Sequence, residues 1–145
     1  MLDPYALHLD WDVILQAGQS KAVDMFLNFP VMDMNRNAIW RNPNGVAQSD
    51  VERMNRFWGD ESWRQVAYRE SAQGNFLFGP EVIKQPNNAI VAAFKERLLN
   101  VAGFGFIPEP LPMRNSRNAV VYYLSLASPK AVAQKIITDI FKKYR

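Results

Sequence analysis

The sequence of 145 residues predicts an α/β fold in which helices cover a sheet that ends in an antiparallel hairpin. Three observations predict it. Strand and helix patterns alternate along the chain, the run FGFIPEPLPM has prolines at alternate positions, and the run AVVYYLSLA is apolar on both faces of an extended chain. Nothing in the length argues for two domains, so we expect a single α/β domain over residues 1–145.

The first elements follow a strand, helix, strand order. Residues 1–6 are expected to form the end of a strand that runs into a turn. Asp10 can cap a helix that buries Trp11 and ends near Gly18. Residues 23–29 (VDMFLNF) are mainly apolar on both faces, which is typical of an inner strand of a covered parallel sheet.

A small helical insert is expected over about residues 49–72. The preceding segment 31–48 is rich in Asn and contains Pro-Asn-Gly, so we interpret it as a loop. Ser49 followed by Glu52 matches a capping box at the start of one helix, and Asp60 can cap a second. The pattern in residues 73–87 predicts no particular element.

The last third of the chain predicts a helix, a hairpin and a final helix. Residues 88–103 carry one apolar stripe and end at a glycine. Residues 104–113 and 119–127 form the two arms of the hairpin. Ser128 can cap the final helix, with Pro129 as its first residue. The apolar stripe expected to be buried by this helix consists of Val132, Ala133, Ile136, Ile137, Ile140, Phe141 and Tyr144.

The position of the two hairpin arms in the sheet follows from Pro108, Pro110 and Pro112. Amides of alternate residues in a strand point the same way, so these prolines remove donors from one side only. We therefore expect residues 104–113 to form an edge strand. Residues 119–127 are β-branched, aromatic or otherwise apolar on both faces, which indicates a strand with a neighbour on each side.

Composition limits the function classes. No apolar run approaches the roughly 20 residues of a membrane span. The absence of cysteine excludes disulfides and thiolate metal sites and fits a cytoplasmic protein, and a single histidine excludes a multi-histidine metal site. The net charge of +3 comes from residues 129–145. This basic tail is interpreted either as a nucleic-acid patch or, as we favour, as ordinary charge placement on a helix.

The order of elements resembles the second half of class I methyltransferases, in which the last strand lies between the fifth and sixth strands. The proline positions match that arrangement. The stretches LDPYALHLDWDVI, VDMFLNFPVMDMNRN and AVVYYLSLASPKAVAQKI look like the C-terminal half of the three-Cys-motif partner (TcmP) family. The resemblance covers nearly the whole chain. It implies the C-terminal half of a Rossmann-like, methyltransferase-type sheet.

The same resemblance implies a bacterial accessory protein whose partner is a protein with a three-cysteine motif. The Gly-rich loop that would hold S-adenosylmethionine precedes the fourth strand of the family pattern and is not found in this sequence. Gly103-Phe104-Gly105 follows a predicted helix and is no substitute. We expect no cofactor for this chain, and S-adenosylmethionine only in a full-length protein.

Asp3, Pro4 and Tyr5 are the candidate catalytic residues. They resemble the Asp/Asn-Pro-Pro-aromatic turn of amino-methyltransferases, where the polar residue accepts hydrogen bonds from the target amine and the ring stacks on a base. Only one proline is present here. The alternative is a turn fixed by Pro4 after a strand.

Asn28, Phe29, Asn35 and Arg36 are the candidate substrate-binding residues. The first two stand at the carboxyl end of a predicted strand, where open α/β sheets bind ligands. Asn35 and Arg36 follow in the predicted loop and suit a phosphate or carboxylate, because Arg offers a planar fork of donors. The simpler alternative is a solvated loop.

Aromatic and basic residues in and beside the insert allow two interpretations. They form either a nucleic-acid surface or, for Trp58 and Trp63, the hydrophobic seam that docks the insert, which we favour. The residues concerned are Trp40, Arg41, Arg53, Arg56, Trp58, Trp63, Arg64, Tyr68 and Arg69.

Two functions are predicted. The first is an accessory or interaction protein of the three-Cys-motif partner type, without activity of its own. The alternative is the C-terminal half of an S-adenosylmethionine-dependent methyltransferase acting on nucleic acid. Simple nucleic-acid binding is a third possibility. An unpaired first strand would also favour self-association, because open strand edges invite pairing.

Overall fold

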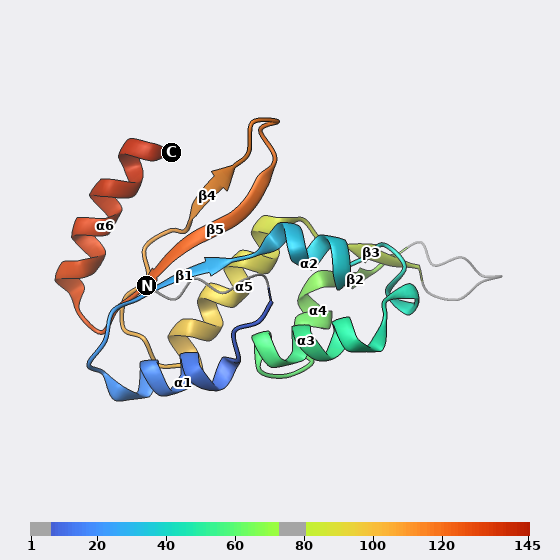
Figure 1. The fold of residues 1–145 in the computed structure, drawn as a ribbon, viewed down its shortest axis with the longest axis horizontal. Coiled ribbons are helices and arrows are strands. Elements are labelled where there is room, and N and C mark those ends of the chain that lie inside the picture. The colour runs from blue at the N-terminus through green and yellow to red at the C-terminus, as the bar shows by residue number, and fades with distance from the viewer. Residues whose placement is uncertain (1–6, 73–80) are drawn as a thin grey trace.

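The computed structural model describes residues 7–72 and 81–145 and confirms a mixed α/β fold with two antiparallel sheets in that part of the chain. The larger sheet has the strand order β1 (Met25–Phe29), β5 (Val120–Ala127), β4 (Leu111–Arg114). The smaller pairs β2 (Tyr68–Glu70) with β3 (Val82–Lys84). Figure 1 shows the two sheets at opposite ends of α2.

The strand β5 lies between β1 and β4, as the proline pattern predicts. Met25 to Phe29 pair with Ala127 to Tyr123, and Leu111 to Met113 pair with Leu124 to Tyr122. Among the described residues β4 has no second neighbour, so it is the edge strand. The hairpin over residues 104–127 is therefore confirmed in its topology.

Two details of the strand predictions are wrong. The edge strand is shorter than residues 104–113, because only Phe106 forms a bridge, to Ser128, before the ladder resumes at Leu111. Pro108 and Pro110 lie between and supply no amide donor. The strand at residues 23–29 begins at Met25, later than predicted. Its antiparallel pairing with β5 agrees with the predicted strand order, and the other neighbour predicted for it falls in residues 1–6, outside the described residues.

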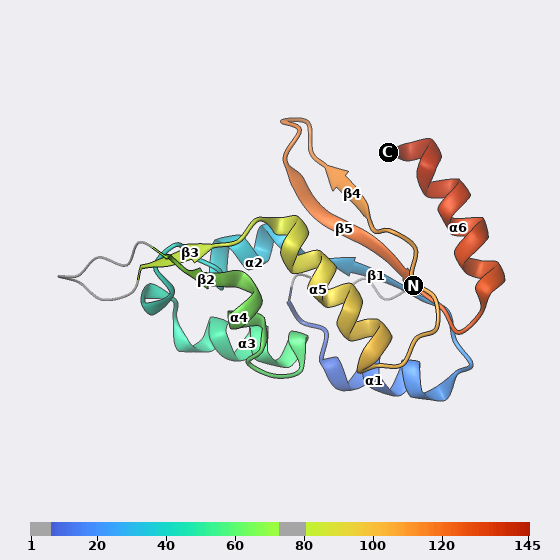
Figure 2. The same cartoon turned by 180° about the vertical axis from the view of Figure 1, so that it is seen from behind.

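The helices α1 (Trp11–Ser20) and α5 (Asn87–Asn100) lie together along β1, whereas α6 (Ala131–Tyr144) lies apart from them, beside β4 and β5 (Figures 1 and 2). The close approach of α1 to the end of α5 requires a glycine. A Cβ atom at Gly18 would lie 2.1 Å from the carbonyl oxygen of Ala102.

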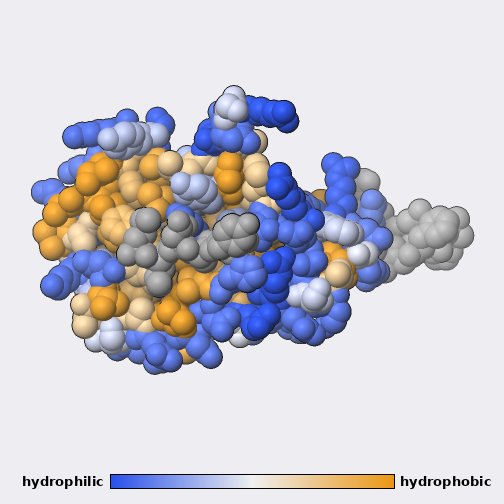
Figure 3. Space-filling view, in the orientation of Figure 1, coloured by the Kyte–Doolittle hydropathy of each residue, from blue (hydrophilic) through white to orange (hydrophobic). Residues whose placement is uncertain are grey.

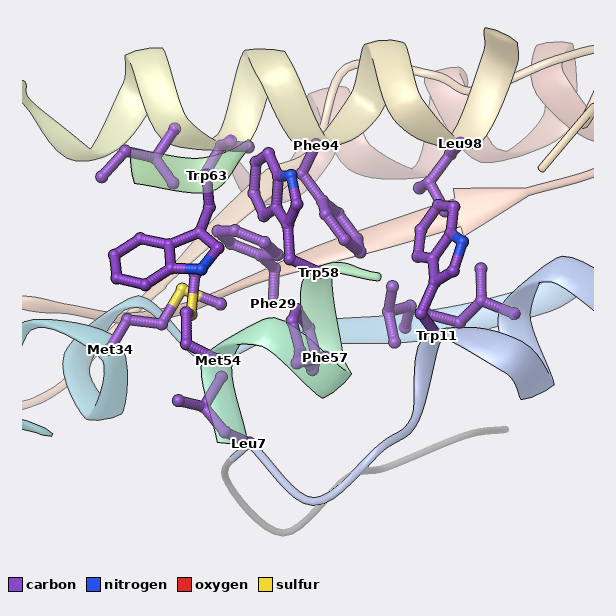
Figure 4. Close-up of a cluster of buried hydrophobic side chains, with 14 of the residues drawn as sticks. Leu7, Trp11, Phe29, Met34, Met54, Phe57, Trp58, Trp63, Phe94 and Leu98 are labelled. Carbon is purple, nitrogen blue, oxygen red and sulfur yellow. The ribbon is translucent and has the colours of Figure 1, made fainter. Parts of the chain in front are cut away.

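The core is centred on Phe94 of α5. Its ring lies 4.7 Å from that of Phe29, 5.3 Å from Phe57, 5.4 Å from Trp58 and 5.9 Å from Trp11, measured between ring centroids. Figure 4 shows these rings gathered between the helices. Offset and tilted aromatic pairs of this kind add to the free energy gained by burial alone. This cluster joins the sheet, α1, α5 and the insert into one core.

The insert consists of α3 (Gln48–Trp58) and α4 (Trp63–Ala67), followed directly by β2. Trp58 and Trp63 are 1% and 2% exposed, and the indole Nε1 of Trp63 donates to Asn55. Both side chains therefore belong to the seam that docks the insert. The favoured interpretation of these two tryptophans is confirmed.

The prediction of a loop over residues 31–48 is wrong in its first part. Residues Val31–Asn37 form the helix α2. Val31 and Met34 are one turn apart and both buried, so packing stabilises a helix that the Asn content disfavours. The Pro-Asn-Gly signal does mark a turn, the short 3₁₀ segment η1 (Pro43–Gly45).

The predicted caps in the insert are wrong. The helix α3 begins at Gln48, one residue before the expected cap Ser49, and no side chain caps it. Asp60 does not cap α4 directly. It accepts hydrogen bonds from the amide and the hydroxyl of Ser62, at 2.9 and 2.5 Å, and so holds the turn before Trp63.

The remaining helix ends differ by a few residues from the predictions. The helix α1 starts after Asp10, whose side chain makes no cap bond, and continues through Gly18 to Ser20. The helix α5 ends at Asn100, and Gly103 adopts a left-handed φ of 83° beyond it. The final helix begins at Ala131, later than predicted.

Ser128 is not the predicted N-cap residue of α6 but binds the amide of Lys130, which holds that position. Its hydroxyl accepts from the amide of Lys130 at 3.0 Å and donates to Asp24. It therefore ties the start of α6 to the segment that leads into β1.

The prediction that α6 buries its whole apolar stripe is wrong. Phe141 is 4% exposed, but Val132, Ile136, Ile140 and Tyr144 are 62%, 54%, 41% and 74% exposed. These four residues recur every fourth position and form one row, named here the α6 row. In the neighbouring row, Ala133 and Ile137 are half-buried and Phe141 is buried.

Candidate binding site at the carboxyl end of β1

The chain passes from β1 through Pro30 directly into α2, so α2 stands at the carboxyl end of this strand. Of the predicted substrate-binding pair, Phe29 is 1% exposed and packs on Phe57 and Phe94. Its side chain serves the core and is not available to a ligand. Asn28 is half-buried within β1, opposite Leu124. Asp3, Pro4 and Tyr5 lie outside the described residues.

Asn35 joins α2 to the start of α5. Its Nδ2 amine donates to the carbonyl of Val31 and to Oδ1 of Asn87, both at 2.8 Å. The Val31 carbonyl only accepts, so it fixes the orientation of the Asn35 amide. Asn87 consequently uses its oxygen here, which leaves its Nδ2 amine as the donor that it can offer to a ligand.

Arg41 follows a segment that is anchored on both sides. Ile39 is fully buried, the indole Nε1 of Trp40 donates to the carbonyl of Arg36 at 2.6 Å, and the hydroxyl of Tyr68 donates to the carbonyl of Trp40 at 2.7 Å. Burial raises the pKa of Tyr68, although Arg64 and the bond to Trp40 act in the opposite direction. The hydroxyl therefore stays a donor at neutral pH and holds the backbone next to Arg41.

Lys84 ends β3 and is positioned by the small sheet. It pairs with Tyr68 across the ladder, and the next amide, of Gln85, donates to the carbonyl of Ala67 at 2.7 Å. Lys84 is half-buried. Burial and then the charge of Arg41 lower the pKa of this ammonium group, because both disfavour a second positive charge at this place.

Arg41 and Lys84 together line two adjoining hollows, named here the Arg41–Lys84 site. The first has a volume of about 580 Å³ and the second about 540 Å³. The first hollow is also lined by Asn42, Pro43, Asn44, Glu81, Val82 and Ile83. The second is also lined by Asn35, Gln85, Pro86 and Asn87.

The site has the electrostatics of an anion receptor. Neither Arg41 nor Lys84 forms an ion pair in the part of the chain that the structure describes. The first turn of α5, a helix of 14 residues, begins at Asn87 and adds the positive end of its dipole to the second hollow. Glu81 is the one acidic side chain lining the first hollow, so an anion is best placed in the second.

The sequence predictions capture part of this site. Asn35 lies in it, whereas Arg36, the other predicted phosphate ligand, is exposed and lines neither hollow. The sequence predicts a ligand role for Arg41 only as part of the nucleic-acid surface, and it predicts none for Lys84 or Asn87. The signal for Arg41 was its place beside the Pro-Asn-Gly turn, but nothing local points to Lys84.

Most of the aromatic residues that could stack on bases in the predicted nucleic-acid surface of the insert are buried or already bonded. Trp58 and Trp63 are buried, and Tyr68 is engaged with Trp40. Trp40 is 41% exposed and is the aromatic side chain of this set that remains accessible. Stacking of several bases on the insert would therefore require its core to open.

Residues 7–72 and 81–145 contain no group of three or more His, Asp or Glu side chains that could hold a metal ion, and none of their helices is long and apolar enough to cross a membrane. Comparisons with protein-family models, with curated proteins and with solved structures found no match.

Proposed function

We propose that the fold is the C-terminal half of a Rossmann-like, methyltransferase-type sheet. Support comes from β5, which lies between β1 and β4 and runs antiparallel to both. This is the strand order expected from the resemblance to class I methyltransferases. The Arg41–Lys84 site then lies at the carboxyl end of β1, where open α/β sheets bind their ligands.

We propose that the chain is an accessory binding module of the three-Cys-motif partner type, and that its ligand carries a phosphate or carboxylate group. The observation that supports this function is that Arg41 and Lys84 line the same two hollows without an acidic ion-pair partner among the described residues. Bringing two cations together raises the energy of the empty site, and the charge of Arg41 adds to the burial that chiefly lowers the pKa of Lys84. An anion relieves that repulsion.

The proposed binding mode divides the work among three groups. The guanidinium of Arg41 provides a planar fork for two oxygens of the anion, and the ammonium of Lys84 provides a compact positive charge. The Nδ2 amine of Asn87 and the first amides of α5 provide neutral donors. This combination is typical of sites that bind phosphate more tightly than a single carboxylate.

The test is a titration of the protein with inorganic phosphate and with citrate. Binding is measured by the amide chemical shifts of the protein and by calorimetry. We expect saturable shifts at Arg41, Lys84 and Asn87. Arg41→Gln and Lys84→Gln should each weaken binding about tenfold or more, in line with a lost charge-assisted hydrogen bond. Arg36→Gln is the matched control, because Arg36 lies on α2 but lines neither hollow.

Two outcomes would contradict the proposed ligand class. One is an absence of saturable shifts at these residues at millimolar phosphate. The other is an equal loss of affinity in Arg36→Gln and Lys84→Gln, which would mean that general positive charge rather than the site attracts the anion.

The methyltransferase half is the second candidate, supported by the same strand order. It differs in its ligand, because S-adenosylmethionine would have to bind. Calorimetry with S-adenosylmethionine separates the candidates: the accessory module gives no binding heat, and saturable heat would favour the methyltransferase. Copurification with a three-cysteine-motif protein would support the accessory role. Steeply salt-dependent binding of nucleic acid without S-adenosylmethionine binding would instead favour the third prediction, simple nucleic-acid binding.

A further inference from the structure

The α6 row is a continuous apolar surface on an otherwise charged helix. Val132, Ile136, Ile140 and Tyr144 follow each other at every fourth position, and each is at least 41% exposed. Figure 3 shows hydrophobic side chains gathered at the end of the molecule that holds α6, β4 and β5. Single exposed apolar residues are ordinary on protein surfaces, but a contiguous patch of large ones indicates an interaction site.

A groove lies beside this row, so the apolar surface is concave along one side. It has a volume of about 570 Å³ and lies between α6 and β4. Leu111 and Leu124 line it from the sheet, Ile140 and Tyr144 line it from α6, and Arg145 lies among its lining residues. The groove and the α6 row therefore share two side chains and form one surface.

The shape of this surface favours a helix over a strand as its occupant. A strand would add to the open edge of β4, but Pro112 in that strand has no amide to donate, and the ladder is irregular between Met113 and Arg114. A row with a spacing of four residues presents the ridge of a helix, and such ridges pack into the grooves of another helix.

The charges around the surface indicate what the occupant carries. Lys135, Lys142 and Lys143 lie on the solvent side of α6, where Asp139 is the one acid. Arg114 and Arg145 are both among the residues that line the groove. A second copy of this chain would bring two such basic rims together, which like-charge repulsion opposes.

We propose that the surface formed by the α6 row and its groove binds an amphipathic helix of a partner protein, with an apolar stripe flanked by Asp and Glu. The apolar stripe covers Ile136, Ile140 and Tyr144, and the acidic flanks contact the lysines of α6. This proposal is independent of the Arg41–Lys84 site, because the groove shares no lining residue with either hollow of that site.

The probe is a labelled, designed amphipathic peptide of about five helical turns with a leucine stripe and glutamate flanks. Fluorescence anisotropy should show saturable binding that weakens as salt is raised, and the amide shifts of the protein should change along α6 and β4. A peptide with the same stripe and lysine flanks should bind at least about tenfold more weakly.

Ile136→Asp and Ile140→Asp should each reduce the affinity for the glutamate-flanked peptide at least about tenfold. Val101→Asp is the matched control, because Val101 is 49% exposed at the end of α5, away from the groove. Lys84→Gln should bind the peptide normally, and Ile140→Asp should bind phosphate normally, so the two proposals fail separately. The shift map on the unaltered protein does not depend on the folding of any variant.

Four results would overturn the proposal. Equal binding of the two peptides would remove the charge argument, and no binding of either peptide would show that the surface does not bind such a helix. A concentration-dependent dimer that Ile140→Asp dissociates would make a second copy the occupant. Binding of the protein to vesicles of mixed phosphatidylserine and phosphatidylcholine, lost in Ile136→Asp, would make the surface a lipid contact.

Discussion

The guanidinium of Arg97 lies over the ring of Trp11, with 4.7 Å between its central carbon and the ring centroid. The same side chain is 15% exposed, donates from Nε to the carbonyl of Trp58 at 3.0 Å and pairs with Asp60 at 3.4 Å. Arg97 thus connects α5 to α1 and to the end of α3. It closes one end of the aromatic core centred on Phe94.

Arg97→Ala should lower the free energy of unfolding by about 2 kcal/mol, because it removes a cation–π contact and leaves the Trp58 carbonyl without its donor. Arg97→Lys should recover only part of this loss, since an ammonium group cannot reproduce the planar fork. Urea unfolding followed by tryptophan fluorescence measures both. A wild-type midpoint in Arg97→Ala would contradict the bridging role.

Asp60 should make stability depend on acid pH. Partial burial alone would raise its pKa, but the hydrogen bonds from Ser62 and the charge of Arg97 outweigh it and hold the pKa below the usual 3.8. The folded state therefore binds this proton more weakly than the unfolded chain. The stabilisation is complete above about pH 4 and is lost as the pH falls through the lower folded-state pKa.

The measurement is the difference in unfolding free energy between the wild type and Asp60→Asn at several pH values. We expect a difference at neutral pH that shrinks toward zero in strong acid. A difference that stays constant with pH would show that the Asp60 charge is not coupled to folding.

Gly18→Ala should destabilise the protein by about 2 kcal/mol or more. The added Cβ would meet the backbone of Ala102, at 2.1 Å from its oxygen and 2.8 Å from its carbon, and backbone cannot move aside as a side chain can. Gly45→Ala is the matched control, because its nearest neighbours are ring carbons of Trp40 at 3.5 Å. Thermal unfolding of the two variants should differ clearly, and equal melting temperatures would contradict the close approach.

Tyr68→Phe should weaken phosphate binding several-fold and reduce stability by about 1 kcal/mol, because it removes the hydrogen bond that holds Trp40 next to Arg41. Calorimetry and urea unfolding give the two numbers. Tyr144→Phe changes the same group on a side chain that is 74% exposed and should leave both unchanged. If Tyr68→Phe binds phosphate normally, Arg41 does not depend on this anchor.

Phosphate affinity should fall at a lower alkaline pH than it would if Lys84 had the usual pKa of a lysine. Burial and Arg41 place the pKa of Lys84 below its usual 10.5. The ammonium group therefore loses its proton below pH 10.5, and the neutral amine no longer attracts the anion. Bound phosphate stabilises the charged form and shifts this loss upward. Calorimetric titrations across the alkaline range test this, and Lys84→Gln should lack the transition.

The topology of the larger sheet could be predicted because its signals are local and chemical. Prolines without amide donors mark the edge strand, and the apolar run of residues 120–127 marks the strand beside it. The helix α2 was missed because its stability comes from the burial of Val31 and Met34, which the polar composition of its sequence conceals. Tertiary packing overrides propensity there.

The binding site was only partly predictable for a related reason. Asn35 and Lys84 are 49 positions apart in the sequence, and they line the same hollow only because β3 pairs with β2 and leads into α5. No periodic pattern marks a strand as short as Val82–Lys84. The exposure of the α6 row could not be predicted either, because a helical stripe shows which face is apolar but not whether another element covers that face.

The placement of β5 between β1 and β4 also constrains the order of assembly. Met25 pairs with Ala127, and Asp24 accepts a hydrogen bond from Ser128, 104 positions later. During synthesis β1 emerges long before its partner, and β4 has nothing to pair with until the strand after it arrives. The larger sheet therefore forms late, through contacts that are distant in sequence and slow to establish. Until then the α1–α3–α5 aromatic cluster is the structure that can protect the apolar face of β1 from aggregation.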